Sequence, residues 1–131
     1  MQLDGYLLDT NAIIAIAAGS SRLGKKTKHL VAKTPNLYYS PVSLAELEIK
    51  MMLGKPLPVG AIFERLAKQD IKELPLYSTH SIALSRFTTL VGHDPFDRLL
   101  ISQATAENLA LITSDRKLIE LNVPWVHDSA E

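Results

Sequence analysis

The chain contains no cysteine among its 131 residues. Disulfide bonds and thiolate metal sites are therefore excluded, and the composition suits a reducing compartment, so we expect the protein to act in the cytoplasm. Long apolar runs are also missing, because the longest early run, residues 12–18, is far shorter than the ~20 residues that span a bilayer. The N-terminus has no basic region before its apolar part. We therefore expect neither a signal peptide nor a membrane partner.

An excess of charge of one sign is absent as well, since 14 acidic residues balance 14 basic ones. A strongly basic surface that attracts nucleic acids is thus excluded, and any contact with RNA or DNA must come from local clusters. Hydrophobic residues make up 47% and charged residues 21% of the chain, the proportions of an ordinary globular protein. A chain of this length predicts a single domain with a real core, spanning residues 1–131.

Short apolar runs alternate with helical periods along the chain. We expect strands at residues 6–8, 37–39, 71–77, 110–113 and 123–126. The pattern predicts helices at residues 11–18, 24–33, 43–53, 59–69, 81–91, 95–108 and 116–121. Strands separated by helices form βαβ units, so the predicted fold class is α/β, a three-layer α/β/α sandwich around a central, mainly parallel sheet.

Four acidic residues occupy comparable places in this layout. Asp9 directly follows one predicted buried strand, and Asp115 lies two residues beyond the end of another. Glu46 and Asp97 each lie just inside a predicted helix. In open parallel sheets, sites form outside the carboxyl ends of the strands. The four acids are therefore candidates for one common site.

Most of these acids also have an ordinary structural explanation. Ser43 and Glu46 match a capping box, in which the serine caps the helix and the glutamate reaches back. Asp94 followed by Pro95 matches an N-cap with proline at the first helical position. Asp115 could cap the helix that follows it, where the helix dipole favours an acid. Capping alone would account for Glu46 and Asp115.

Asp97 is not explained in this way. Asp97, Leu100, Ile101 and Ala104 follow the spacing i, i+3, i+4, i+7, which places the carboxylate on the same stripe as the apolar residues that face the core. A carboxylate on the inward rim is costly unless something compensates it. Because Asp94 already supplies the cap, we expect Asp97 to have a chemical role.

Four carboxylates gathered at one place would repel one another. No lysine or histidine recurs beside each of them, so a divalent cation is the simplest partner, and ligands that are all oxygen favour Mg²⁺ or Mn²⁺ over zinc. The four histidines are scattered without ligand spacing. Only His93, just before the Asp94 cap, could approach the acids.

Four motifs follow one another along the chain: LLDTN, SPVSLAELEIKMMLGK, HDPFDRLLISQA and LITSD. Together they resemble the PIN-domain family, in particular the VapC-like toxins of type II toxin–antitoxin pairs with a DPFDR signature, over about residues 6–126. The resemblance implies a metal-dependent endoribonuclease toxin that cleaves RNA. Its Mg²⁺ or Mn²⁺ would be held by Asp9, Glu46, Asp97 and Asp115. It also implies a small cognate antitoxin protein that neutralises the nuclease, and a homodimer.

The resemblance further implies two supporting hydroxyl groups, one from Thr10 and one from Ser114 or Thr113. It implies hydrolysis of an RNA phosphodiester bond that leaves a 5′-phosphate and a 3′-hydroxyl. Arg98 and Arg116 each directly follow a proposed ligand, so they could contact a substrate phosphate.

Three other interpretations compete with this one. A receiver domain or an aspartyl-phosphate phosphatase would need a second acid near Asp9, and the sequence there is Asp9-Thr10-Asn11. A catalytically inactive PIN-like scaffold that binds RNA or protein is disfavoured, because all four acids are retained.

The end of the helix predicted at 43–53 leaves a question open. Met51, Met52 and Leu53 cannot all face one core from a single helix. Part of this surface would then belong to an interface, or the two methionines simply pack flexibly.

Overall fold

In the computed structural model of the protein, which describes residues 2–131, five short strands form one sheet. The strands are β1 (Tyr6–Leu8), β2 (Leu37–Tyr39), β3 (Lys72–Glu73), β4 (Ala110–Thr113) and β5 (Val126–Asp128). Their order across the sheet is β3-β2-β1-β4-β5, and every neighbouring pair is parallel. The predicted parallel sheet is confirmed.

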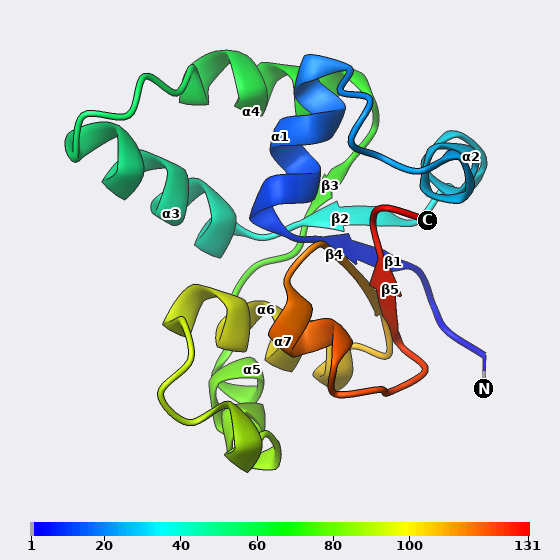
Figure 1. Cartoon of the computed structure of the whole chain (residues 1–131), viewed down its shortest axis with the longest axis vertical. Coiled ribbons are helices and arrows are strands. Elements are labelled where there is room, and N and C mark those ends of the chain that lie inside the picture. Colours follow the sequence, from blue (N-terminus) through cyan, green and yellow to red (C-terminus); the bar gives the residue numbers. More distant parts are fainter. Residues whose placement is uncertain (1) are drawn as a thin grey trace.

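Helices cover both faces of this sheet (Figure 1). The helices are α1 (Thr10–Ala18), α2 (Lys25–Lys33), α3 (Pro41–Met52), α4 (Val59–Lys68), α5 (Ser78–Ile82), α6 (Pro95–Ala106) and α7 (Arg116–Ile119). Helices α1, α3 and α4 lie on one side, and α5, α6 and α7 on the other, which gives the expected three layers. Among residues 2–131, no helix is long and apolar enough to cross a membrane.

Two apolar cores form because neighbouring strand residues point to opposite faces of a sheet. Leu8 and Ile112 pack against α1 and α4, in one core. Leu7 and Leu111 pack against α6 and α7, in the other. All four side chains are fully buried, so β1 and β4 are the central strands that join the layers.

The connections between strands place a site at a defined edge of the sheet. The chain runs from β1 through β2 to β3 on one side, and then returns past β1 to form β4 and β5. Leu8 pairs with Ile112, so β1 and β4 end side by side. Their carboxyl ends are the point where the strand order reverses, which is where open α/β sheets bind ligands.

Helix α3 begins at Pro41, two residues earlier than the sequence predicts, and the capping box of Ser43 and Glu46 is wrong. Ser40 is the N-cap, because its Oγ accepts a hydrogen bond from the Val42 N–H at 3.1 Å and Pro41 occupies the first helical position. Ser43 therefore lies inside the first turn and is fully buried. Glu46 lies further along the helix, where it cannot reach back to the cap.

Three other elements have boundaries that differ from those predicted from the sequence. The predicted strand 71–77 is reduced to Lys72–Glu73, and Pro75 cannot donate a hydrogen bond to a continuing ladder. The predicted helix 81–91 is α5 followed by the 3₁₀ turns Ala83–Arg86 and Thr88–Leu90, since Phe87 leaves the helical region with φ −114° and ψ 60°. The last strand begins only at Val126.

Candidate metal centre

A cavity of about 420 Å³ opens at the carboxyl ends of β1 and β4. All four predicted acids line it, although they come from four separate segments of the chain: Asp9, Glu46, Asp97 and Asp115. The remaining lining residues are Thr10, Asn11, Lys50, Ser114 and Arg116. The fold therefore brings together the residues that sequence spacing alone places far apart.

Asp9 is the most buried of these acids, with only 2% of its surface exposed. It caps α1, because its Oδ1 accepts a hydrogen bond from the Ala12 N–H at 2.8 Å. Burial raises the pKa of the Asp9 carboxyl, while hydrogen bonds from Thr113, Ala12 and the Ser114 backbone oppose that rise. The cap thus holds the carboxylate in a fixed orientation at the end of β1.

The Thr113 hydroxyl joins two of the acid-bearing segments. It donates to Asp9 Oδ2 at 2.6 Å and accepts from the Asp115 N–H at 3.0 Å. Thr113 itself is fully buried at the end of β4. Of the two hydroxyl residues considered there, Thr113 contacts an acid through its side chain, whereas the Ser114 side chain is exposed and lines the cavity.

Glu46 is held from both sides of its carboxylate. The Thr10 hydroxyl donates to Oε1 at 2.6 Å, and the Lys50 ammonium lies 3.2 Å from Oε2, one helical turn away on α3. Ser43 Oγ lies 3.0 Å from the Thr10 hydroxyl oxygen and supports it. Lys50 was not predicted from the sequence. Its i, i+4 spacing from Glu46 is the signal that could have found it.

Asp97 is the acid whose charge is least compensated. It lies in the first turn of α6, and Leu100, Ile101 and Ala104 on the same stripe are fully buried, as predicted. Burial, followed by the charges of Asp115, Asp94, Glu46 and Asp9, raises the pKa of Asp97 to about 7.

Asp94 has a different role from Asp97. Its Oδ1 accepts from the Phe96 N–H at 2.8 Å and from the Asp97 N–H at 3.2 Å. Asp94 is therefore the cap of α6, as the sequence predicts, and it does not line the acidic cavity.

His93 completes the cluster, in agreement with the expectation that it could approach the acids. Its Nε2 lies 2.8 Å from Asp115 Oδ2 and 3.4 Å from Asp97 Oδ2. In the tautomer that carries its proton on Nε2, His93 donates this hydrogen bond to Asp115, whereas a cation would need the same nitrogen without its proton. Asp115 makes no side-chain cap to α7, so the capping explanation for it fails. The i, i+4 spacing of His93 and Asp97 was the available signal.

The two predicted substrate-binding arginines differ in position. Arg116 lines the cavity at its rim, with its guanidinium 3.6 Å from Asp128 and largely exposed. Arg98 is not among the lining residues, and its Nε is buried without a hydrogen-bond partner.

The donor set fits a divalent cation. One ligand atom each from His93, Asp97 and Asp115 lie within 4.8 Å of one another. The surrounding donors are carboxylate and hydroxyl oxygens, which suit Mg²⁺ or Mn²⁺. Burial, and then the charges of four neighbouring acids, raise the pKa of Asp97, so its ionised form is destabilised when no cation is bound. A bound cation would remove this imbalance.

A parallel α/β sandwich with acids clustered where the strand order reverses belongs to the class of open α/β folds that carry their site at this edge of the sheet. The chain belongs to the PIN domain family, whose pattern it matches over residues 6–123. Nuclease activity is the general activity of this family, and a divalent metal its usual cofactor. Among curated protein sequences, no significant match was found.

Solved structures with the same fold include three complexes. VapBC-1 from nontypeable Haemophilus influenzae is 23% identical with a TM-score of 0.70, covering 97% of this chain and 99% of that chain. VapBC2 from Rickettsia felis, bound to a promoter DNA fragment, is 20% identical with a TM-score of 0.66, covering 94% and 96%. VapBC-5 from Mycobacterium tuberculosis, of the VapBC toxin–antitoxin family, is 18% identical with a TM-score of 0.62, covering 94% and 95%.

Proposed function

We propose that this chain is a single PIN-like nuclease domain that acts in the cytoplasm as a metal-dependent endoribonuclease toxin. The observation that carries the proposal is the convergence of four acids from four segments on one open cavity at the carboxyl ends of β1 and β4. An inactive scaffold would not require this gathering of like charges, which costs stability. The PIN family and the fold shared with VapBC complexes support the toxin assignment.

The residues that would hold Mg²⁺ or Mn²⁺ are Asp9, Glu46, Asp97 and Asp115. A bound cation would supply positive charge for the phosphate and would lower the pKa of a water molecule at the site. Hydrolysis adds the water oxygen to phosphorus and breaks the bond to the 3′-oxygen, which takes up a proton. The products are therefore a 5′-phosphate and a 3′-hydroxyl.

The chain's own residues would prepare this chemistry. Thr113 and Thr10 donate hydrogen bonds to Asp9 and Glu46, which fixes two carboxylates before any substrate arrives. Lys50 and Arg116 line the same cavity and would attract the RNA backbone. The cavity is open, so it suits single-stranded or looped RNA, whose backbone can be reached.

A small antitoxin protein is the proposed partner. The VapBC structures that share this fold are toxin–antitoxin assemblies. A cell that makes a ribonuclease toxin needs it silenced, and a basic segment would be attracted to the acids. The test is co-purification of the chain with the product of an adjacent small reading frame, followed by loss of ribonuclease activity in the complex.

Self-association is proposed as well. At the end of α3, Met52 and Leu53 are 80% and 78% exposed, and Ile49 and Met51 beside them are also exposed. Apolar residues gathered in this way mark interaction surfaces more often than single exposed ones do. A homodimer through this surface would bury them. Light scattering that shows only monomer at tens of micromolar would exclude the dimer.

The decisive experiment is cleavage of a labelled single-stranded RNA by the purified chain. We expect cleavage with Mg²⁺ or Mn²⁺ and none after addition of EDTA. Mapping of the cleaved ends should find 5′-phosphates. Retention of full activity in Asp9→Asn and Asp97→Asn would show that a contaminating nuclease is responsible.

A further inference from the structure

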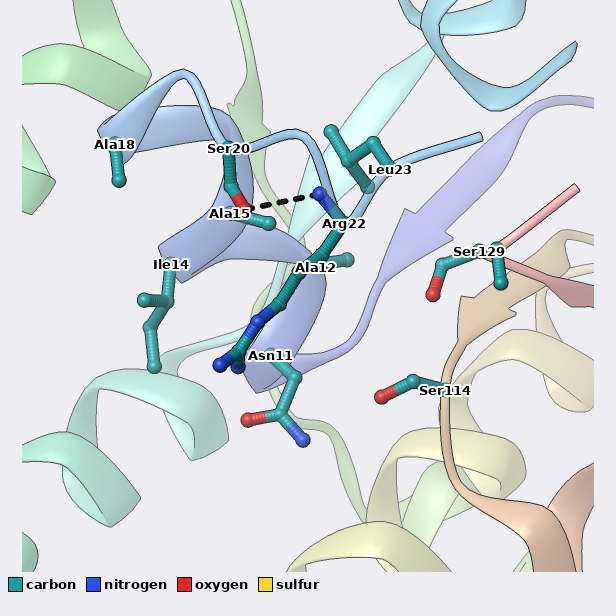
Figure 2. A pocket seen from close by; sticks show the side chains of 11 residues that line it. Asn11, Ala12, Ile14, Ala15, Ala18, Ser20, Arg22, Leu23, Ser114 and Ser129 are labelled. Carbon is teal, nitrogen blue, oxygen red and sulfur yellow. Dashed lines mark hydrogen bonds between the residues drawn. The ribbon is translucent and has the colours of Figure 1, made fainter. Parts of the chain in front are cut away.

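A second cavity, of about 530 Å³, adjoins the acidic cavity (Figure 2). Asn11 and Ser114 line both, so the two spaces meet on either side of these residues. The size lies within the range of about 300–1,000 Å³ that small-molecule sites occupy. None of the four acids lines this second cavity, so the proposed metal site does not account for it.

The lining combines an apolar wall with polar edges. Ile14 and Ala15 from α1 supply part of the apolar wall. Figure 2 shows the hydroxyl groups of Ser114 and Ser129 directed into the space opposite α1. Together with the Asn11 amide, these groups can both donate and accept hydrogen bonds.

Arg22 gives the cavity its charge. Its side chain runs back along α1, and its guanidinium ends beside Asn11, which also lines the acidic cavity (Figure 2). Among residues 2–131, the ion pairs of the other cations include Lys50 with Glu46 and Arg116 with Asp128, but none involves Arg22. Arg22 is therefore a cation without a carboxylate partner, beside a site that we propose acts on a polyanion.

The loop that carries Arg22 is fixed at both ends. Gly19 ends α1 with φ 62°, in the left-handed region that favours glycine, and turns the chain back. Ser20 Oγ then accepts a hydrogen bond from the Arg22 N–H at 3.1 Å. At the far end, the Gly24 N–H donates to the Ser129 carbonyl at 2.9 Å, and a Cβ at Gly24 would collide with the backbone of Glu131.

We infer that this second cavity is a subsite for one nucleotide of the RNA strand, next to the cleaved bond, with Arg22 contacting the adjacent phosphate. Guanidinium groups match phosphate oxygens in geometry and charge. The sugar and base would lie against the apolar wall of α1 and within reach of Asn11, Ser114 and Ser129. The inference rests on the proposed ribonuclease function and adds a substrate-binding residue to it.

Charge favours RNA over a protein segment as the occupant. A basic antitoxin segment directed at the acids would meet a second positive charge at Arg22. A nucleotide presents the opposite charge at the same place. The cavity also continues directly from the acidic one, as a single strand that passes both sites requires.

Two substitutions test the subsite without touching the acids. Arg22→Gln removes the charge and keeps most of the side-chain length. Ala18→Phe fills the rim from an exposed position at the end of α1, so it should not disturb the core. Arg86→Gln is the matched control, because Arg86 is an exposed arginine that lines a different cavity.

Binding of a fluorescent single-stranded RNA should be measured in the Asp97→Asn background, in which we expect no cleavage. We expect Arg22→Gln to weaken binding about tenfold or more, as the loss of a charged hydrogen bond implies. It should also lower the slope of log K against log salt by about 0.7, the value for one phosphate contact on a single strand. Ala18→Phe should weaken binding, and Arg86→Gln should change neither quantity.

Cleavage by proteins that retain Asp97 separates this inference from the proposed function. We expect Arg22→Gln to raise KM about tenfold while kcat and the metal-induced rise in melting temperature stay near those of the unsubstituted chain. If the unsubstituted chain cleaves RNA but Arg22→Gln matches Arg86→Gln in affinity, salt slope and KM, the subsite is wrong and the nuclease stands. If neither Arg22→Gln nor Ala18→Phe weakens RNA binding, the cavity is not a nucleotide subsite, and a protein segment becomes the alternative occupant. A chain that cleaves no RNA with either metal overturns both proposals.

Discussion

Neutralising Asp97 should stabilise the metal-free protein while abolishing its function. The perturbation is Asp97→Asn, which keeps the shape of the side chain and removes its charge. Burial and the charges of the neighbouring acids raise the pKa of Asp97 from 3.8 to about 7. Ionised Asp97 is therefore disfavoured in the folded metal-free protein, and an amide at this position would relieve the repulsion.

The magnitude follows from proton linkage. Between about pH 4 and pH 7 the folded chain holds a proton on Asp97 that the unfolded chain has released, so stability falls as pH rises through this window. At about 1.36 kcal/mol per pKa unit, the full effect would be about 4 kcal/mol. The Asp97 side chain is 23% exposed, and solvent reduces the effect to on the order of 1–2 kcal/mol.

The assay is thermal unfolding in the presence of EDTA, monitored by circular dichroism. At about pH 7.5, Asp97→Asn should melt higher by roughly 3–10 °C, since 1 kcal/mol corresponds to about 3–5 °C for a chain of this size. Near pH 4 the two proteins should melt at nearly the same temperature, because this pH is close to the pKa of 3.8 for the unfolded chain and folded Asp97 is protonated. With Mg²⁺ or Mn²⁺ added, the unsubstituted protein should gain stability and cleave RNA, and Asp97→Asn should do neither.

Asp94→Asn is the matched control, one turn away. Asparagine caps a helix as well as aspartate, so this variant should keep its stability, metal response and cleavage nearly unchanged. Asp94→Ala should lose about 1 kcal/mol, because the hydrogen bonds to the Phe96 and Asp97 N–H groups disappear. If Asp97→Asn keeps cleavage and metal response while Asp94→Asn loses both, the two roles are reversed and the reasoning is refuted.

Three further predictions can be measured on the same material. A hundredfold excess of Mg²⁺ or Mn²⁺ over its dissociation constant should stabilise the unsubstituted chain by about 2.7 kcal/mol in thermal unfolding, and no change with either metal at constant ionic strength would speak against the carboxylate site. Asp9→Asn should abolish cleavage of labelled RNA with the circular dichroism spectrum retained, and undiminished cleavage would remove Asp9 from the site. Thr113→Val should cost about 1–3 kcal/mol in denaturant unfolding, because Asp9 and the Asp115 N–H lose a buried partner; Ser114→Ala, at the exposed neighbour, should change little.

Much of the site follows from local patterns in the sequence. Asp9 and Asp115 end buried strands, and a parallel sheet brings such ends to one edge. Asp97 shares the buried stripe of Leu100 and Ile101, so helical periodicity alone gives its direction. These features depend only on short-range spacing, and for that reason the amino-acid sequence alone predicts them.

Other parts depend on contacts that spacing does not encode. A serine followed three residues later by a glutamate fits both a capping box and the observed arrangement, in which Ser43 supports Thr10 and Thr10 holds Glu46. Only the proline at position 41, which sets the helix start, decides between them. The contact between His93 and Asp115 joins a loop to a strand end that is 22 residues away, and no local pattern indicates it.

The two acids at the centre of the site are supported in opposite ways. Asp9 receives hydrogen bonds from the Ala12 N–H and the Thr113 hydroxyl, which lower its pKa against the effect of burial. Among residues 2–131, Asp97 receives no comparable donors: its nearest partner is His93 at 3.4 Å, and burial together with four neighbouring acids raises its pKa. The fold thus orients one carboxylate in advance and leaves the other to be satisfied by a cation. It follows that removing metal should disturb the environment of Asp97 far more than that of Asp9. Carboxyl resonances followed by NMR through a metal titration should show the larger change at Asp97, and an equal change at both would contradict this division.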